Sequence, residues 1–136
     1  MTGKIEHLGI AVANLDEAEA LYTALLGTAP YKREEVASEG VRTSFFMSGT
    51  NKIELLEASN TDSPIHKFVE KKGQGIHHVA FHVEDIVSEM KRLKDAGFVL
   101  LHETPKKGAD NKLICFVHPK TTGGVLIELC QDDPER

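Results

Sequence analysis

The sequence predicts an α+β fold built from two βαβββ modules, and an internal repeat is the main indication. Residues 5–12, IEHLGIAV, resemble residues 76–83, IHHVAFHV, which places His7 over His78. A stretch with apolar side chains at helical spacing follows each segment. Each half ends in a strand that contains Ile-Glu-Leu, which places Glu54 over Glu128. The two halves therefore share one plan.

The first module begins and ends its helix with recognisable capping residues. Asn14 precedes the stretch LDEAEALYTALL at residues 15–26, and Gly27 follows it. An Asn at the N-cap and a Gly after the last turn are typical helix boundaries. The alternating and β-leaning runs around this helix predict four strands, at residues 4–12, 30–37, 41–48 and 51–58.

The second module repeats this plan after a connecting segment. Its predicted helix covers residues 86–96, between Asp85 and Gly97. Its predicted strands cover residues 76–83, 98–103, 112–117 and 124–130. We expect one domain over residues 1–136, with module one at 4–58, module two at 76–130 and a linker at 59–75. Ser63, Pro64 and Gly73 predict a short helix within that linker.

Composition limits the class of protein. The 136 residues are 40% apolar and 27% charged, enough for one compact domain. The 16 basic residues against 21 acidic residues predict no strongly basic face, so nucleic acid is not an expected partner. Apolar runs fall far short of the roughly twenty residues that span a bilayer. The start of the chain lacks a targeting pattern, so we expect a cytoplasmic protein without a membrane partner.

The two cysteines point to buried thiols. Cys115 and Cys130 both lie in apolar, strand-like runs and lack CxxC spacing. This pattern favours free thiols over a disulfide or a sulfur metal site.

Four residues of the repeat have side chains of the types that bind metal ions in proteins. Because side chains alternate along a strand, His7 and His78 project away from the apolar side of their strands. Glu54 and Glu128 each project opposite to an apolar pair in a strand that otherwise looks buried. A buried carboxylate needs a cation or several hydrogen-bond donors. The four side chains could therefore meet at one divalent ion, and imidazole with carboxylate suits Zn, Co, Mn, Ni or Fe(II).

Each of these residues also has a simpler interpretation when taken alone. A single His at the start of a strand is more often a surface or hydrogen-bonded core residue than a ligand. A single Glu within a strand can face water on the solvated side of a sheet. The coincidence of four such residues in both halves favours the metal interpretation.

The whole chain resembles the methylmalonyl-CoA epimerase family of the vicinal oxygen chelate superfamily. The resemblance extends from IEHLGIAV through GIHHVAFHVEDI to HPKTTGGVLIELCQ. The paired βαβββ repeat indicates only the superfamily. The adjacent His77 and His78, and the segment HPKTTGGVLIEL at residues 118–129, are similar to the epimerases in particular.

This resemblance implies a fold, a reaction and a set of site residues. The fold is a cup-shaped, eight-stranded mixed sheet of the glyoxalase/bleomycin-resistance type. The implied ligands of one divalent metal ion, Co²⁺, Mn²⁺, Zn²⁺ or Ni²⁺, are His7, Glu54, His78 and Glu128. The implied reaction interconverts the 2S and 2R forms of methylmalonyl-CoA through an enolate, with Glu128 as one acid/base group. An acyl-CoA substrate and a homodimer are also implied.

Two further residues are candidates for binding the substrate. Some epimerases have a second Glu three residues after the Gly of a GV pair in the third strand, where this chain has Thr43. Thr43 is a poor base, so Glu39, Glu54, a water molecule or the substrate itself could take that role. Lys120, in the HPKTTGG segment, could neutralise the phosphate charge of CoA, although a solvated Lys fits that position equally well.

Two other functions are open to the same fold. One is a glyoxalase-like lyase or isomerase, which keeps the metal but acts on a glutathione hemithioacetal. The other is a metal-free resistance protein that binds a small molecule. Such a protein needs no ligand set, so the four metal-binding side chains count against it.

Overall fold

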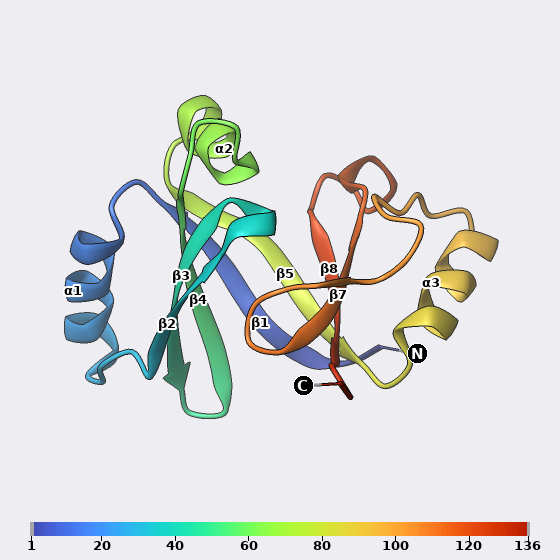
Figure 1. Ribbon diagram of the computed structural model, residues 1–136, viewed down its shortest axis with the longest axis horizontal. Helices are drawn as coiled ribbons and strands as arrows, with labels where there is room; N and C mark the ends of the chain where they lie inside the picture. The colour runs from blue at the N-terminus through green and yellow to red at the C-terminus, as the bar shows by residue number, and fades with distance from the viewer. Residues whose placement is uncertain (1, 136) are drawn as a thin grey trace. The chain divides into compact units, whose positions relative to one another are not determined.

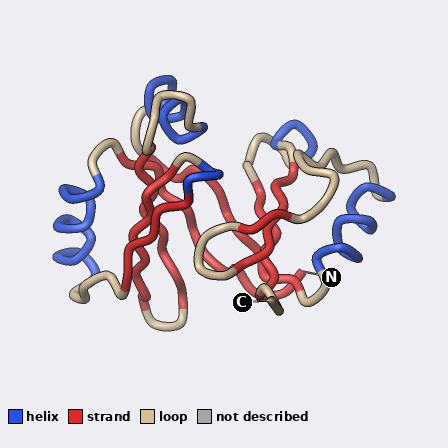
Figure 2. Tube along the Cα trace, viewed as in Figure 1, coloured by secondary structure: helices blue, strands red, loops and turns tan. Residues whose placement is uncertain are grey.

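The structure is a computed structural model that describes residues 2–135, and its elements largely follow the predicted order (Figure 1). The N-terminal elements are β1 (Thr2–Val12), α1 (Leu15–Leu26), β2 (Lys32–Val36), η1 (Ala37–Glu39), β3 (Val41–Ser48), β4 (Asn51–Ala58) and α2 (Pro64–Lys72). The C-terminal elements are β5 (Gly75–Val83), α3 (Ile86–Asp95), β6 (Lys106–Lys107), β7 (Lys112–Val117), η2 (Pro119–Thr121) and β8 (Ile127–Asp132). Figure 2 shows strands as the main component of both halves of the chain.

The strands pair in the same way in both modules. β1 runs parallel to β4, and β5 runs parallel to β8. The remaining ladders within the modules, β2 with β3, β3 with β4, β6 with β7 and β7 with β8, are antiparallel. The hydrogen-bonded order of the eight strands is β2-β3-β4-β1-β5-β8-β7-β6. This mixed sheet with a repeated βαβββ order confirms the predicted fold class.

The chain divides into two compact units, each of which is described by itself. The N-terminal unit is His7–His77. The C-terminal unit contains residues 78–135 and the first part of β1, residues 2–6. Strand β1 therefore contributes to both units. That the two modules act as one domain stays a prediction.

Helices cover the sheet of the N-terminal unit on both faces. α1 packs Leu15 and Ala18 on a cluster that includes Phe46 and Leu55, and this face is called the α1 face. On the opposite face, α2 packs Ile65 against a second apolar cluster that contains Ala11, Val41 and Leu56. Because side chains alternate along the strands, His7, Lys52 and Glu54 belong to this second face. It is called the site face below.

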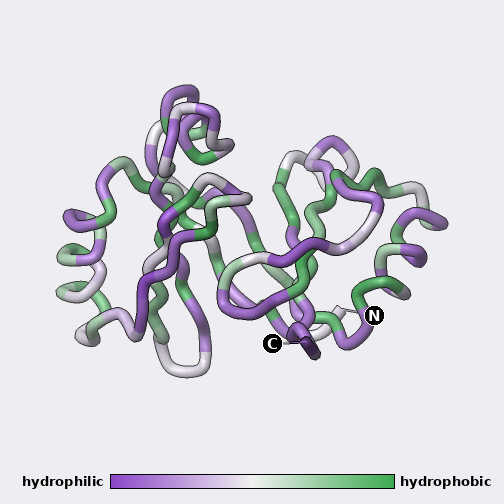
Figure 3. Tube along the Cα trace, viewed as in Figure 1, coloured by the Kyte–Doolittle hydropathy of each residue, from purple (hydrophilic) through white to green (hydrophobic). Residues whose placement is uncertain are grey.

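The C-terminal unit repeats this arrangement with α3. Ile86, Met90 and Leu93 of α3 pack on one face of the sheet, against a cluster that includes Cys115, Val117 and Leu129. The helix carries hydrophobic and hydrophilic residues on different sides, and both kinds are visible along it in Figure 3. The opposite face holds Ala80, Ile114 and Cys130, with Phe116 packed against them. His78 and Glu128 alternate onto that face.

The predicted helix boundaries agree with the structure to within a residue. Asn14 Oδ1 accepts a hydrogen bond from the Glu17 N–H, with an N–O distance of 3.0 Å. Ser63 and Asp85 cap α2 and α3 in the same manner. The left-handed backbone of Gly27, with φ of 72°, ends α1. Side-chain caps of this kind satisfy the free N–H groups of the first turn.

The predicted sixth strand, residues 98–103, is wrong. This segment contacts β7 through one isolated bridge, Leu100 to Val117, and the strand in this position is the short β6 at Lys106–Lys107. Phe98 and Leu100 pack instead against the α3 cluster, whereas Val99 and Leu101 are exposed. The last strand also begins later than predicted, at Ile127. The reason is that Gly124 still has a positive φ of 96° and belongs to the preceding turn.

Both cysteines are free and buried, as predicted. Burial raises the pKa of the Cys115 thiol to about 11, which keeps it protonated at neutral pH. No helix within residues 2–135 combines the length and the apolar character needed to cross a membrane.

Candidate active site

The N-terminal unit brings the first predicted pair of site residues into contact. His7 Nδ1 lies 3.3 Å from Glu54 Oε2. The two residues come from the adjacent parallel strands β1 and β4, where Gly9 is the register partner of Glu54. Both are only 4% exposed. An imidazole and a carboxylate in contact within a buried setting form a polar pair whose desolvation needs a compensating partner.

The C-terminal unit contains the equivalent pair. His78 Nε2 lies 3.0 Å from Glu128 Oε1, and both residues are 5% exposed. They come from β5 and β8, where Ala80 is the register partner of Glu128. In both units, therefore, the His stands two residues before the partner of the Glu. The repeat in the sequence therefore corresponds to a repeated contact between a His and a Glu side chain.

The donor chemistry of the two pairs fits a divalent transition metal. Each pair presents one imidazole nitrogen and one carboxylate oxygen close together in a buried place. Zn²⁺ and its neighbours in the first transition row accept this mixture of nitrogen and oxygen ligands. A bound cation also neutralises carboxylates that are costly to bury.

An aromatic ring lies beside His78 of the second pair. Phe116, the register partner of Glu128 on β7, meets the His78 ring edge to face, with ring centroids 5.6 Å apart. The His102 ring lies on the same Phe116, with centroids 6.1 Å apart. His102 is partly buried and contacts this aromatic neighbour. Rings of this kind fix the orientation of His78.

Thr43 is buried on the site face, but the structure does not test its predicted role. Its side chain is inaccessible to solvent, and Oγ1 has no hydrogen-bond partner among the described residues. Its register partner on β2 is Glu34, whose side chain is 34% exposed. Residues opposite each other in an antiparallel pair have Cβ atoms about 5 Å apart and share a face. Glu34 therefore offers a carboxylate on the strand next to Thr43.

Lys120 lies in η2, where it is exposed. Its backbone N–H donates to His118 Nδ1 at 3.1 Å, so the turn that carries it is ordered by a side-chain cap. The role of Lys120 in binding substrate stays a prediction.

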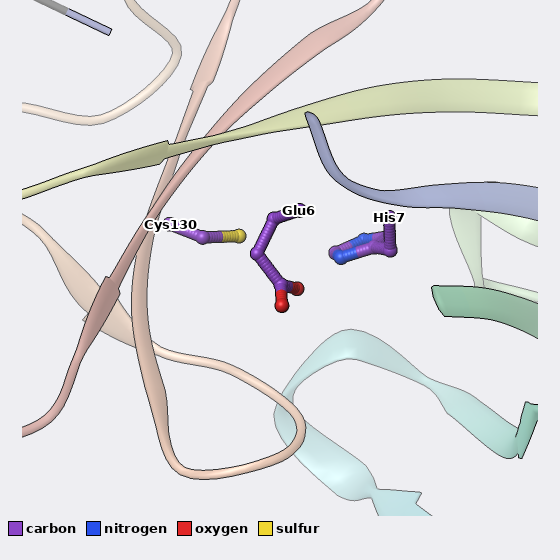
Figure 4. A group of neighbouring side chains, drawn as sticks. All are labelled: Glu6, His7 and Cys130. Atoms are coloured by element: carbon purple, nitrogen blue, oxygen red, sulfur yellow. The ribbon is translucent and has the colours of Figure 1, made fainter. Parts of the chain in front are cut away.

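Several polar residues near these pairs escape prediction from sequence. Lys52 is buried beside Glu54, and Glu34 faces the position of Thr43. Figure 4 shows a third case, the Glu6 carboxylate beside the Cys130 thiol in the C-terminal unit. A ligand atom of Glu6 lies within 4.8 Å of Cys130 Sγ. These contacts depend on strand register between distant parts of the chain, which residue spacing does not reveal.

A hollow in the N-terminal unit contains none of the predicted site residues. It has a volume of about 310 Å³ and is lined by residues of α1, including Ala18, Leu21 and Tyr22, with Gln74 and Gly75 before the second module.

Comparison with known proteins places the chain in a superfamily. Residues 6–116 match the Glyoxalase/Bleomycin resistance protein/Dioxygenase superfamily. The chain belongs to this superfamily, which agrees with the duplicated fold and with the His and Glu pairs.

Relatives within this superfamily indicate a more specific class of protein, the methylmalonyl-CoA epimerases. The chain is 41% identical to the ethylmalonyl-CoA/methylmalonyl-CoA epimerase of Cereibacter sphaeroides, over 96% of this chain and 99% of that protein. The crystal structure of methylmalonyl-CoA epimerase from Mycobacterium tuberculosis superposes with a TM-score of 0.92 at 37% identity, covering 96% of this chain and 89% of that one.

A third relative was solved with a ligand. It is a variant of Streptomyces coelicolor methylmalonyl-CoA epimerase in complex with 2-nitronate-propionyl-CoA, with a TM-score of 0.92 at 32% identity over 97% of this chain and 99% of that one. These relatives confirm the resemblance to the epimerases that the sequence indicates.

Proposed function

We propose that the protein is a methylmalonyl-CoA epimerase that inverts C2 of its acyl-CoA substrate. The observation that carries this proposal is the pair of buried His–Glu contacts at equivalent register positions of two modules. It gains support from relatives that bear this name and align over nearly the full chain.

We further propose that His7, Glu54, His78 and Glu128 together hold one divalent ion, with Co²⁺, Mn²⁺, Zn²⁺ and Ni²⁺ as candidates. Such an ion, when bound, acts as a Lewis acid and lowers the energy of negative charge on the thioester oxygen. The four side chains are at most 5% exposed, and low exposure to water strengthens the electrostatic interactions between them.

Inversion at C2 requires proton transfer on both sides of a planar enolate. Glu128 is the proposed acid/base group for one side. Thr43 lacks a titratable group that could serve the other side. Glu34, opposite Thr43 on the site face, is our candidate for that role, because its longer side chain can extend from the neighbouring strand.

The remaining parts of the proposal concern binding and assembly. Lys120 is the candidate for neutralising CoA phosphate, and Thr43 is a candidate substrate contact. A homodimer in the cytoplasm completes the proposal, and light scattering on the purified protein measures its oligomeric state.

Deuterium uptake from heavy water tests the proposed activity directly. Each epimer of methylmalonyl-CoA, incubated with the protein and a divalent ion, is expected to gain deuterium at C2 and to convert to the other epimer. Absence of both exchange and inversion with every candidate ion defeats the proposal. Metal analysis of the same preparation separates the enzymes from the metal-free binding protein, and turnover of a glutathione hemithioacetal would support the glyoxalase-like alternative.

A further inference from the structure

A network of ion pairs joins helix α1 to strand β2 within the N-terminal unit. Arg33 of β2 forms a two-pronged pair with Glu19 of α1, in which Nε lies 2.6 Å from Oε2 and Nη2 lies 2.9 Å from Oε1. Nη2 also donates to Asp16 Oδ1 at 2.5 Å. A bidentate pair of this kind fixes the relative orientation of its two groups as well as their distance. Helix and strand are therefore held together at one defined place.

A buried hydroxyl ties the same carboxylate to the next strand. Ser44 of β3 is fully buried, and its Oγ donates to Glu19 Oε2 at 2.6 Å. Ser44 is also the register partner of Arg33. The Arg33 hydrogen bonds hold the pKa of Glu19 below its ordinary value of 4.5, so this carboxylate is ionised at neutral pH. The Glu19 side chain is 20% exposed, so water screens the contact less than it screens a pair in open solvent.

The strand that this network holds lies at the end of the sheet. β2 has five residues, and β3 is its only ladder partner among residues 2–135. An edge strand receives ladder hydrogen bonds on one side only, and short elements with few backbone partners open most easily. The contact of Arg33 with α1 therefore gives β2 a second support.

Glu34 follows Arg33 directly along β2. Because side chains alternate along a strand, Arg33 projects onto the α1 face and Glu34 onto the site face, where Thr43 is its register partner. Consecutive Cα atoms are about 3.8 Å apart, so a shift of the backbone at Arg33 also moves Glu34. A general base works only within hydrogen-bond reach of its proton, and a misplacement of about 1 Å can lower a rate by about 100-fold.

We propose that Arg33, held by Glu19, is a positioning residue that fixes β2 so that the Glu34 carboxylate stays opposite Thr43 for proton transfer. This inference rests on the proposed function, in which Glu34 serves the second side of the enolate. It deepens that function by naming what keeps the group in place. Arg33 acts without touching the substrate, because its side chain lies on the other face of the sheet.

Deuterium exchange at C2 of each epimer tests the proposal with Arg33→Gln. The epimer whose exchange depends on Glu34 is identified first with Glu34→Gln. Arg33→Gln is expected to lower kcat for this same epimer by about 10-fold, less than the loss of about 100-fold expected when the carboxylate itself is removed. KM for both epimers, and exchange of the other epimer, should stay within about threefold of wild type. Equal losses for both epimers overturn the proposal, because a general weakening of the fold produces that result.

A double variant shows whether Arg33 acts through Glu34. When Arg33→Gln is added to Glu34→Gln, exchange should slow by less than about a further threefold, because the group that Arg33 positions is already lost. A further loss of about 10-fold means that the two residues act independently and overturns the proposal. A Glu34→Gln protein that exchanges both epimers at the wild-type rate removes the role of Glu34, and this inference with it.

Arg42→Gln is the matched control. The Arg42 side chain is 46% exposed against 43% for Arg33, and it forms an ion pair of the same 2.6 Å length with Glu57. Arg42 also lies on the α1 face, but its pair joins β3 to β4, which both have ladder partners on two sides. The Arg42→Gln substitution is expected to leave exchange of both epimers within about threefold of wild type.

Exchange of backbone amide hydrogens gives a readout that does not depend on activity. Mass spectrometry of the peptide that covers residues 30–37 should show exchange about 10-fold faster in Arg33→Gln than in wild type or Arg42→Gln. An unchanged rate in Arg33→Gln overturns the proposal. Absent C2 exchange in the wild-type protein is a different result, which defeats the proposed function. Glu19→Gln breaks the same pair from the helix side and provides the same test if Arg33→Gln does not fold.

Discussion

At the scale of single residues, the two His–Glu pairs differ from ordinary surface ion pairs in their burial. An exposed pair contributes little because water screens both charges. His7, Glu54, His78 and Glu128 are all at most 5% exposed, so each pair has lost most of its hydration. Such groups are retained where a charged ligand or a reaction needs them, which is why we assign the proposed site to these residues rather than to the many surface carboxylates.

A first prediction concerns the single residues Thr43 and Glu34, which oppose each other on β3 and β2. Thr43→Ala is expected to retain most of the turnover, because a Thr hydroxyl cannot act as the second base. Glu34→Gln is expected to slow inversion by about 100-fold, the lower range for loss of a general acid or base. Deuterium exchange at C2 should persist for one of the two epimers, since Glu128 still serves its own side. Proton NMR in heavy water follows exchange and inversion together.

Glu35→Gln is the matched control for this measurement. Glu35 is the next residue on β2, is exposed, and pairs in register with Arg42 on the other face of the ladder. The Glu35→Gln substitution should leave the rates of inversion and of deuterium exchange unchanged. Equal rates for Glu34→Gln and wild type would show that another group works on the second side, and a large loss in Thr43→Ala with metal retained would assign that side to Thr43.

At the scale of elements, prediction from sequence succeeds where the signal is local. The caps at Asn14, Ser63 and Asp85 determine where helices begin, and these residues lie within three positions of the N–H groups that they bind. The segment at residues 98–103 has a strand-like composition, but only Phe98 and Leu100 are covered, and they pack against the α3 cluster. Tertiary packing of this kind overrides local β preference.

The residues of the candidate site also differ in whether the sequence alone or only the tertiary structure reveals them. His7, Glu54, His78 and Glu128 are recognisable because the repeat places them in register within the sequence. Lys52 is not, because a Lys in a strand ordinarily lies at the surface with its ammonium in water. Only the ladders of β4 with β1 and β3 show that Lys52 faces inward.

α3 provides a test of a buried charge within one element. Glu89 is only 3% exposed, and its carboxylate accepts hydrogen bonds from the Arg92 guanidinium, with a distance of 2.6 Å to Nε. The Arg92 hydrogen bond holds the pKa of Glu89 below the ordinary value of 4.5. A lowered pKa in the folded state means that the ionised carboxylate stabilises the fold above pH 4.5, and that this contribution is lost as pH falls through the folded pKa.

Glu89→Gln is therefore expected to lower the free energy of unfolding by about 1 kcal/mol at pH 7, a modest value because the Arg92 side chain is half exposed. The difference from wild type should shrink as pH falls below 4.5. Urea unfolding at a series of pH values measures it. Asp95→Asn, which removes an exposed carboxylate paired with Lys91 on the same helix, serves as the control and should change stability by less than about 0.5 kcal/mol. A pH-independent effect of Glu89→Gln would show that packing, not ionisation, is responsible.

At the scale of the whole molecule, duplication gives each of the two modules a copy of the same buried His–Glu pair. Each module contributes one imidazole and one carboxylate at the same register position. Neither pair alone supplies the three or four protein ligands that are typical of a tightly bound transition metal. A single His–Glu pair therefore makes a weak site, which is why the proposed ligand set takes two residues from each module.

The stoichiometry of metal binding follows from this argument. We expect one divalent ion for each chain, and we expect His7→Ala and His78→Ala each to weaken its binding by more than the 10- to 100-fold that is typical for loss of an outer-shell partner. Titration of the metal-free protein, followed by calorimetry and elemental analysis, measures both quantities. His66→Ala, which removes an exposed imidazole of α2 that pairs with Glu70 at 3.6 Å, is the control and should bind metal as wild type does. If the protein instead binds two ions for each chain and either His variant loses only one of them, each module binds its own metal. A single shared ion predicts that either substitution weakens the binding of that one ion.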